Sequence, residues 1–132
     1  MPIQLNTAAR NILRDAYRTT LFPAGAVLTI RTGSPAGANN AATGTVLATI
    51  TLPATPWTDG VGQVSKSAGA WEDTSADATG VAAYYRLTQG SYVEEGTITA
   101  TGGGGDMTLD NTSLATGQLF TITSFTRTMP AA

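Results

Sequence analysis

From Gly25 onward, apolar residues recur at every second position in short runs, and dense turn formers separate these runs. Alternation of this kind sends successive side chains to opposite faces, so each run predicts a half-buried β-strand. The run that ends the chain shows it best, with Phe120 and Ile122 on one face and Leu119 and Phe125 on the other. About seven or eight such runs between turns are typical of a sandwich or barrel. The expected strands cover Val27–Thr32, Thr45–Leu52, Gly62–Ala70, Ala82–Thr88, Ser91–Thr101, Met107–Leu109 and Leu119–Thr128.

One helix is expected, and it precedes the strands. Apolar residues at three- and four-residue steps form a stripe made of Leu5, Ala8 or Ala9, Ile12, Leu13, Ala16 and Tyr17. Asn6 or Thr7 can cap the first turn, and Pro23 and Gly25 require the helix to end by Thr20. We therefore expect a mainly β fold, an antiparallel β-sandwich of jelly-roll type with one N-terminal α-helix. Residues 1–132 would form a single domain, with the helix and its connector in 1–24 and the sandwich in 25–132.

Three arginines form a second row on the same helix, at Arg10, Arg14 and Arg18. The apolar stripe must bury against the chain's own sheet or against another subunit, and packing on its own sheet is the default. In that arrangement the arginine row faces outward, either solvated or available to an acidic neighbour. Leu5 and the three arginines are therefore candidate interface residues.

The two tryptophans, Trp57 and Trp71, lie in Pro-, Gly- or Ala-rich surroundings that resemble loops. Large aromatic side chains on loops are often interface anchors, and both residues are candidates for that role. They could equally cover the open end of a sandwich core.

The chain has no histidine and no cysteine, which removes the usual base of nucleophilic triads and the usual ligands of zinc. We expect no enzymatic activity, no cofactor and no metal. Charged residues are only 12% of the chain, whereas Thr, Ala and Gly supply 60 of its 132 residues. So little surface charge suits a protein that is docked on neighbours.

Composition also argues against two classes of partner. The net charge of −2, with a single lysine, offers no basic surface for nucleic acid. No stretch approaches the roughly 20 apolar residues that span a bilayer. We therefore expect neither a nucleic-acid partner nor a membrane.

Three further motifs have a functional and a structural interpretation. The glycine tract at 102–105 could hold a phosphate, but it lacks the following Lys and Ser or Thr, so a hairpin tip or surface loop is expected. The adjacent Glu94 and Glu95 could be a catalytic pair, although neighbours on a strand point to opposite faces, and a solvated strand edge is expected. Four aspartates could bind calcium or simply hydrogen-bond their own turns, the second being expected: Asp73, Asp77, Asp106 and Asp110.

Three segments taken in order resemble a family of small proteins encoded by tailed bacteriophages and prophages: Met1–Arg10, Asp73–Gly80 and Leu109–Ser113, the last running on through Gly117–Gln118 into Thr121–Thr126. The resemblance implies a virion structural protein, and the nearest functional analogy is a capsid cement or decoration protein with a jelly-roll-like sandwich. It would bind the major capsid protein on the outer surface of the virion, as a homodimer or homotrimer made in the bacterial cytoplasm.

Two alternatives stay open at this stage. A tail-associated tube, adaptor or fibre-base module would share the composition and the virion context. A surface carbohydrate-binding sandwich would use Trp57, Trp71 or Tyr84 as stacking platforms. Under the cement interpretation, deleting residues 1–20 should leave a folded sandwich and weaken association.

Overall fold

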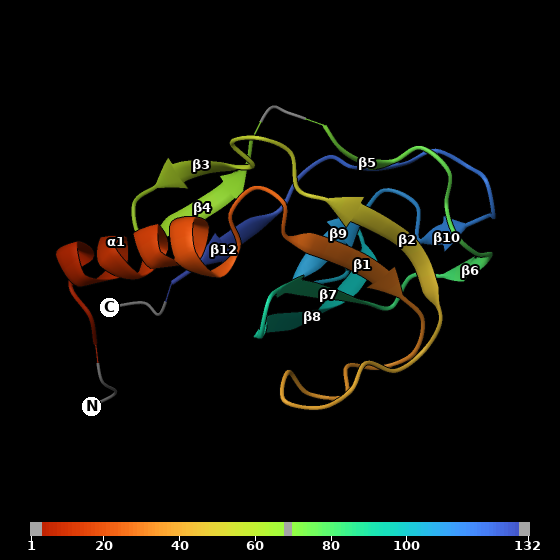
Figure 1. Ribbon diagram of the computed structural model, residues 1–132, viewed down its shortest axis with the longest axis horizontal. Coiled ribbons are helices and arrows are strands. Elements are labelled where there is room, and N and C mark those ends of the chain that lie inside the picture. Colours follow the sequence, from red (N-terminus) through yellow and green to blue (C-terminus); the bar gives the residue numbers. More distant parts are fainter. Residues whose placement is uncertain (1–3, 68–69, 130–132) are drawn as a thin grey trace.

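A computed structural model of the chain describes residues 4–67 and 70–129. Two helical segments come first and strands follow (Figure 1). The helical segments are α1 (Thr7–Ala16) and the π-helical turn η1 (Tyr17–Leu21). The strands are β1 (Val27–Arg31), β2 (Val46–Thr51), β3 (Trp57–Gly60), β4 (Gln63–Lys66), β5 (Trp71–Asp73), β6 (Gly80–Val81), β7 (Tyr84–Gln89), β8 (Tyr92–Ala100), β9 (Met107–Leu109), β10 (Ser113–Leu114), β11 (Phe120–Ile122) and β12 (Thr126–Thr128).

These strands form one larger sheet and three smaller ones. The larger sheet has five strands in the order β2-β1-β7-β8-β9, and the next has the order β12-β4-β3. Two-stranded ribbons pair β10 with β6 and β11 with β5. All pairings are antiparallel except β8 with β9. The expectation of a mainly β protein with an N-terminal helix is confirmed.

The last expected strand is divided in two. Phe120 and Ile122 are buried in β11, as the alternation predicts. Leu119 is 58% exposed whereas Phe125 is buried, so the expectation that these two share a face is wrong. The chain leaves the strand between Ile122 and Thr126, which lets Phe125 turn into the core while β12 pairs with β4 instead of β5.

The glycine tract makes the parallel pairing of β8 with β9 possible. Only residues 101–106 separate these strands, far fewer than the dozen or more that usually connect parallel neighbours. Gly102 and Gly104 have φ values of +89° and +82°, which L-residues rarely adopt. A Cβ on Gly103 would lie 2.7 Å from Thr99, so the tract folds back tightly against β8. It forms a compact return loop rather than a hairpin tip.

Residues on both sides of the expected boundary at residue 24 share one core. Tyr17 and Phe22 are 4% and 3% exposed and belong to the same buried cluster as the strand residues. Their rings meet edge to face, with centroids 5.2 Å apart, and Tyr17 also meets Trp57 at 5.4 Å. The helical segment is therefore anchored in the core through its C-terminal end.

Candidate functional site

Helix α1 begins at the expected cap. The side chain of Asn6 accepts a hydrogen bond from the main-chain N–H of Ala9 at 2.9 Å. This bond satisfies one of the free donors of the first turn. The helix then packs against the hairpin formed by β3 and β4 (Figure 1).

The arginine row faces that hairpin rather than solvent, so the expectation that it points outward is wrong. Arg14 donates from Nη1 to the main-chain oxygen of Gly60 at 2.9 Å. Arg18 places its Nε 2.9 Å from a carboxylate oxygen of Asp59, and Arg14 lies 4.0 Å from the same oxygen. The side chain of Arg14 is only 17% exposed.

The remaining contacts of the arginine row and its neighbours also attach α1 to the hairpin. Arg10 lies against Gly62, where an added Cβ would meet its guanidinium carbon at 2.7 Å. Asn11 accepts a bond from the Gly62 N–H at 2.9 Å. Asp15 bridges Arg14 and Arg18, each at 3.1 Å, and the hydrogen bond from Arg14 lowers the pKa of its carboxyl. Polar groups therefore attach α1 to the hairpin.

The apolar stripe of α1 faces away from the protein instead. Ile12 is 70% exposed and Leu13 is 39% exposed, and no residue of α1 itself is buried. Leu5 is half-buried, and Ala8 and Ala16 are exposed. Tyr17, the last residue of the stripe, is buried in the core, whereas Ile12 and Leu13 leave an apolar surface uncovered on a well-attached helix. The expectation that the stripe packs against the chain itself therefore holds for Tyr17 and is wrong for Ile12 and Leu13.

Both tryptophans lie in strands and in the core. Trp57 begins β3 and is 6% exposed, and Trp71 begins β5 and is 1% exposed. Their rings meet edge to face with centroids 4.9 Å apart, and Trp57 donates from its indole nitrogen to the Phe22 oxygen at 2.8 Å. Of the two roles that their sequence context allows, the structure shows the core role. Neither ring is available on the protein surface.

The same burial applies to Tyr84, which is 0% exposed. The aromatic rings that were candidates for stacking on a carbohydrate are therefore all inside the protein. A glycan-binding role built on them is not compatible with this structure.

A partly buried polar cluster around Glu94 was not expected from the sequence. One carboxylate oxygen accepts hydrogen bonds from the hydroxyls of Tyr17 at 3.0 Å and Tyr85 at 2.9 Å. The other accepts from Nε of Arg127 at 2.7 Å. Burial, followed by the nearby Glu94 charge, raises the pKa of both tyrosines above their ordinary value. Arg127 also lies over the Tyr17 ring, 5.7 Å from its centroid.

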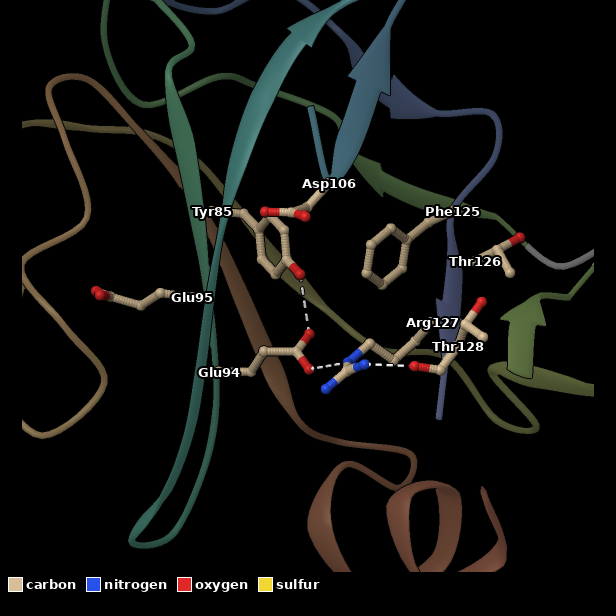
Figure 2. Close-up of a pocket in the computed structure, with 8 residues that line it drawn as sticks. All are labelled: Tyr85, Glu94, Glu95, Asp106, Phe125, Thr126, Arg127 and Thr128. Carbon is tan, nitrogen blue, oxygen red and sulfur yellow. Dashed lines mark hydrogen bonds and ion pairs between the residues drawn. The ribbon is translucent and has the colours of Figure 1, made fainter. Parts of the chain in front are cut away.

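This cluster borders a groove of about 440 Å³ (Figure 2). The lining residues are Tyr85, Glu94, Glu95, Asp106, Phe125, Thr126, Arg127 and Thr128. Both oxygens of Glu94 are already engaged, and the two tyrosines hold their protons more tightly than usual. The cluster therefore acts as a fixed hydrogen-bonded support that joins η1, β7, β8 and β12.

Glu94 and Glu95 point to opposite faces of β8, as expected, but neither is solvated. The Glu95 side chain is 4% exposed and forms an ion pair with Arg86 at 2.7 Å, and it also accepts from the Gly37 N–H at 2.8 Å. The Glu94 side chain is 13% exposed. The prediction of a solvated edge protected by charge is wrong.

The aspartates hydrogen-bond nearby turns and strands. Asp73 accepts from the main-chain nitrogens of Thr49 at 2.9 Å and Ser75 at 3.0 Å. Asp106 accepts from the Thr97 nitrogen at 2.9 Å. Within residues 4–67 and 70–129, no three acidic side chains gather as a metal site would require. In the same part of the chain, neither helical segment is long and apolar enough to cross a bilayer.

Comparisons with protein-family models, with curated proteins and with solved structures found no match to this chain.

Proposed function

We propose that this chain is a non-enzymatic structural protein of a tailed-phage virion, a cement or decoration protein on the outer capsid surface. Its partner would be the major capsid protein, and its role would be to stabilise the head. It would act as a homodimer or homotrimer, made in the bacterial cytoplasm and placed on the outside of the virion. The observation that carries the proposal is the outward apolar stripe of α1 on a helix that polar contacts fix in place.

The stripe suits repeated docking on a lattice. Ile12 is 70% exposed in the isolated chain, and burying such a side chain contributes about 1.5–3 kcal/mol. Because the arginine row already fixes α1 to the β3–β4 hairpin, docking orders little additional chain. Many copies with a modest contact each would then reinforce a shell without any chemistry.

The finer description of the fold belongs to the same proposal. We infer a β-sandwich of jelly-roll type, in which the five-stranded sheet and the sheet of β12, β4 and β3 form the two layers. The support is that Tyr85 of β7 meets Phe125, just before β12, at 5.4 Å between ring centroids. Phe125 in turn lies 6.0 Å from Trp57 of β3. A rigid sandwich of this kind would give α1 a firm base.

The test is binding of the purified chain to capsids of its phage that lack it. An Ile12→Asp substitution places a charge in the middle of the stripe, and we expect it to weaken binding by about tenfold or more. Ile12 makes little contact within the chain, so the stability of the free protein should change by less than about 0.5 kcal/mol.

Val81→Asp is the matched control, because Val81 is 58% exposed and lies on β6, outside the stripe. It should bind capsids like the unchanged protein. Equal binding by both variants and the unchanged chain would contradict the role given to α1.

A further inference from the structure

Strand β8 is paired along one side only over its first half. Its neighbour β9 pairs with residues Ile98–Ala100, and among residues 4–67 and 70–129 no strand pairs with Tyr92–Gly96 on that side. The main-chain N–H of Ile98 donates to the Ala83 oxygen at 2.9 Å. Ile98 and every second residue before it in β8 therefore direct their main-chain groups toward β7. Because these bonds alternate along an antiparallel pair, Val93 and Glu95 direct their main-chain groups away from β7.

The hydrogen bond of Thr97 confirms that the odd-numbered residues of β8 direct their main-chain groups away from β7. Its main-chain N–H, two positions beyond Glu95, points to the same side and donates to Asp106 at 2.9 Å. No corresponding partner is present for the outward main-chain groups of Val93 and Glu95 in the part of the chain that the structure describes. Four main-chain groups on one strand edge are therefore available for pairing.

Charge does not protect this edge. Proteins often protect exposed edges with charged side chains that repel another strand. Here Glu94 is neutralised by Arg127 on one face and Glu95 by Arg86 on the other, both at 2.7 Å. An approaching strand would meet the main chain rather than a free carboxylate.

The edge borders a groove that is made up of two hollows. A hollow of about 440 Å³ lies on the Asp106 side of the Glu94–Arg127 pair, and another of about 470 Å³ lies on the Tyr92 side. The Glu95 side chain points away from the first hollow, so its main chain is what borders that space (Figure 2). Residues of β12 form one wall, and Ala38 borders the second hollow.

We propose that the β8 edge at Val93–Glu95 binds an extended peptide segment, which adds to the five-stranded sheet end to end with β9. Main-chain hydrogen bonds supply the recognition, as in other cases of strand addition. The hollow near Tyr92 also has Leu21 and Phe22 in its lining, so it takes apolar side chains. Asp106 lies at the opposite end, and its carboxylate takes a basic side chain. This site goes beyond the virion role and does not depend on it.

The test uses the full-length protein and the peptide LVTVTKK, made in both chain directions because the geometry permits either. Amide hydrogen exchange by NMR is followed at Val93 and Glu95. We expect rapid exchange in the free protein and at least tenfold slower exchange when one of the two peptides is saturating. The same peptide with its alternate main-chain nitrogens methylated lacks the donors and should give no protection.

Two variants locate the site. Val93→Pro removes one outward N–H and should abolish binding, whereas Val93→Thr keeps it and should bind normally. Asp106→Asn should weaken binding of the lysine-containing peptide by about threefold, since it removes one exposed charge pair. If Val93→Pro does not fold, the exchange measurement on the unchanged protein still shows whether the peptide binds at the β8 edge.

Absence of protection with both peptides would overturn the proposal. Protection that rises with protein concentration in the absence of peptide would also overturn it, because the occupant would then be a second copy. Protection at Val93 and Glu95 by peptide alone, lost on methylation, would establish it.

Discussion

Glu94 joins residues that are far apart in the sequence. Its carboxylate binds Tyr17 of η1, Tyr85 of β7 and Arg127 beside the groove, so one side chain holds three separate segments together. The side chain is 13% exposed, which makes loss of its charge more costly than at the surface. It therefore has a structural role, because it holds three segments of the fold in place.

We predict that Glu94→Gln lowers the free energy of unfolding by about 1–3 kcal/mol, because a charged acceptor of three hydrogen bonds becomes a neutral amide. Denaturant unfolding followed by tryptophan fluorescence measures this. Glu72→Gln is the matched control at an exposed position on β5, and it should stay within about 0.5 kcal/mol of the unchanged chain. Equal effects of the two substitutions would contradict the role of Glu94.

A second prediction concerns alkaline pH. Tyr17 and Tyr85 have pKa values raised above 10.0 in the folded state, mainly by burial. Unfolding lets them ionise, so the stability they contribute is complete below pH 10 and decreases as the pH rises further. In a titration followed by tyrosinate absorbance, these two residues should ionise only together with loss of the folded state. Their ionisation in a folded protein would contradict the burial of both hydroxyls.

Local rules anticipated several single residues correctly. The Asn6 cap follows from the preference of helix starts for short polar side chains, and the opposite directions of Glu94 and Glu95 follow from strand geometry. The Glu94 cluster could not be anticipated in this way. Its partners Tyr17 and Arg127 lie 77 and 33 positions away, and only the tertiary fold brings them together.

At the level of elements, charge and hydrogen bonding attach α1 along its length, and the stripe contributes through Tyr17, which is buried just beyond the end of α1. The stripe has little area to bury, because alanines make up much of it, whereas the β3–β4 hairpin offers a carboxylate and free carbonyls to long arginines. Periodicity located the helix correctly, but it could not show which face of the helix would pack against the hairpin. The residue that reveals this in hindsight is Asp59, just before the hairpin turn.

We predict that Asp59→Ala loosens α1, because both Arg14 and Arg18 lose a carboxylate partner. These pairs are partly exposed, so the loss of global stability should be small, about 1 kcal/mol or less. Amide exchange within α1 should nevertheless become several times faster than within β7. Unchanged protection of α1 would show that the apolar residues attach the helix after all.

Strand prediction succeeded for several alternating runs, failed for the run that ends the chain, which is divided between β11 and β12, and missed the strands that begin with tryptophan. The range Met107–Leu109 is reproduced residue for residue, and Leu28 and Ile30 are buried as expected. Trp57 and Trp71 each begin a very short strand, and their Pro- and Gly-rich flanks concealed both.

Taken as a whole, the molecule uses its N-terminal region in two ways. Residues Thr7–Ala16 form a helix with no buried residue, whereas Tyr17 enters the aromatic core. The expectation that residues 1–20 could be removed without affecting the fold therefore needs correction, since that deletion also takes Tyr17 from Phe22, Trp57 and Glu94.

Two truncations make a matched pair. Deletion of residues 1–16 should leave a folded protein with weakened capsid binding, since no residue of α1 is buried in the core. Deletion of residues 1–20 should lower the free energy of unfolding by about 3–5 kcal/mol more, because it removes the buried ring of Tyr17 and leaves a cavity. Thermal unfolding of both proteins measures the difference. Equal stabilities would contradict the anchoring role of Tyr17.

The virion role that we propose is tested most directly by the copy number of this protein in purified particles of a phage that carries its gene, measured by quantitative mass spectrometry. A lattice cement predicts hundreds of copies in a simple ratio to the major capsid protein. A few copies per particle would place the protein in the tail or portal region, and its absence from the particles would contradict a structural role in the virion.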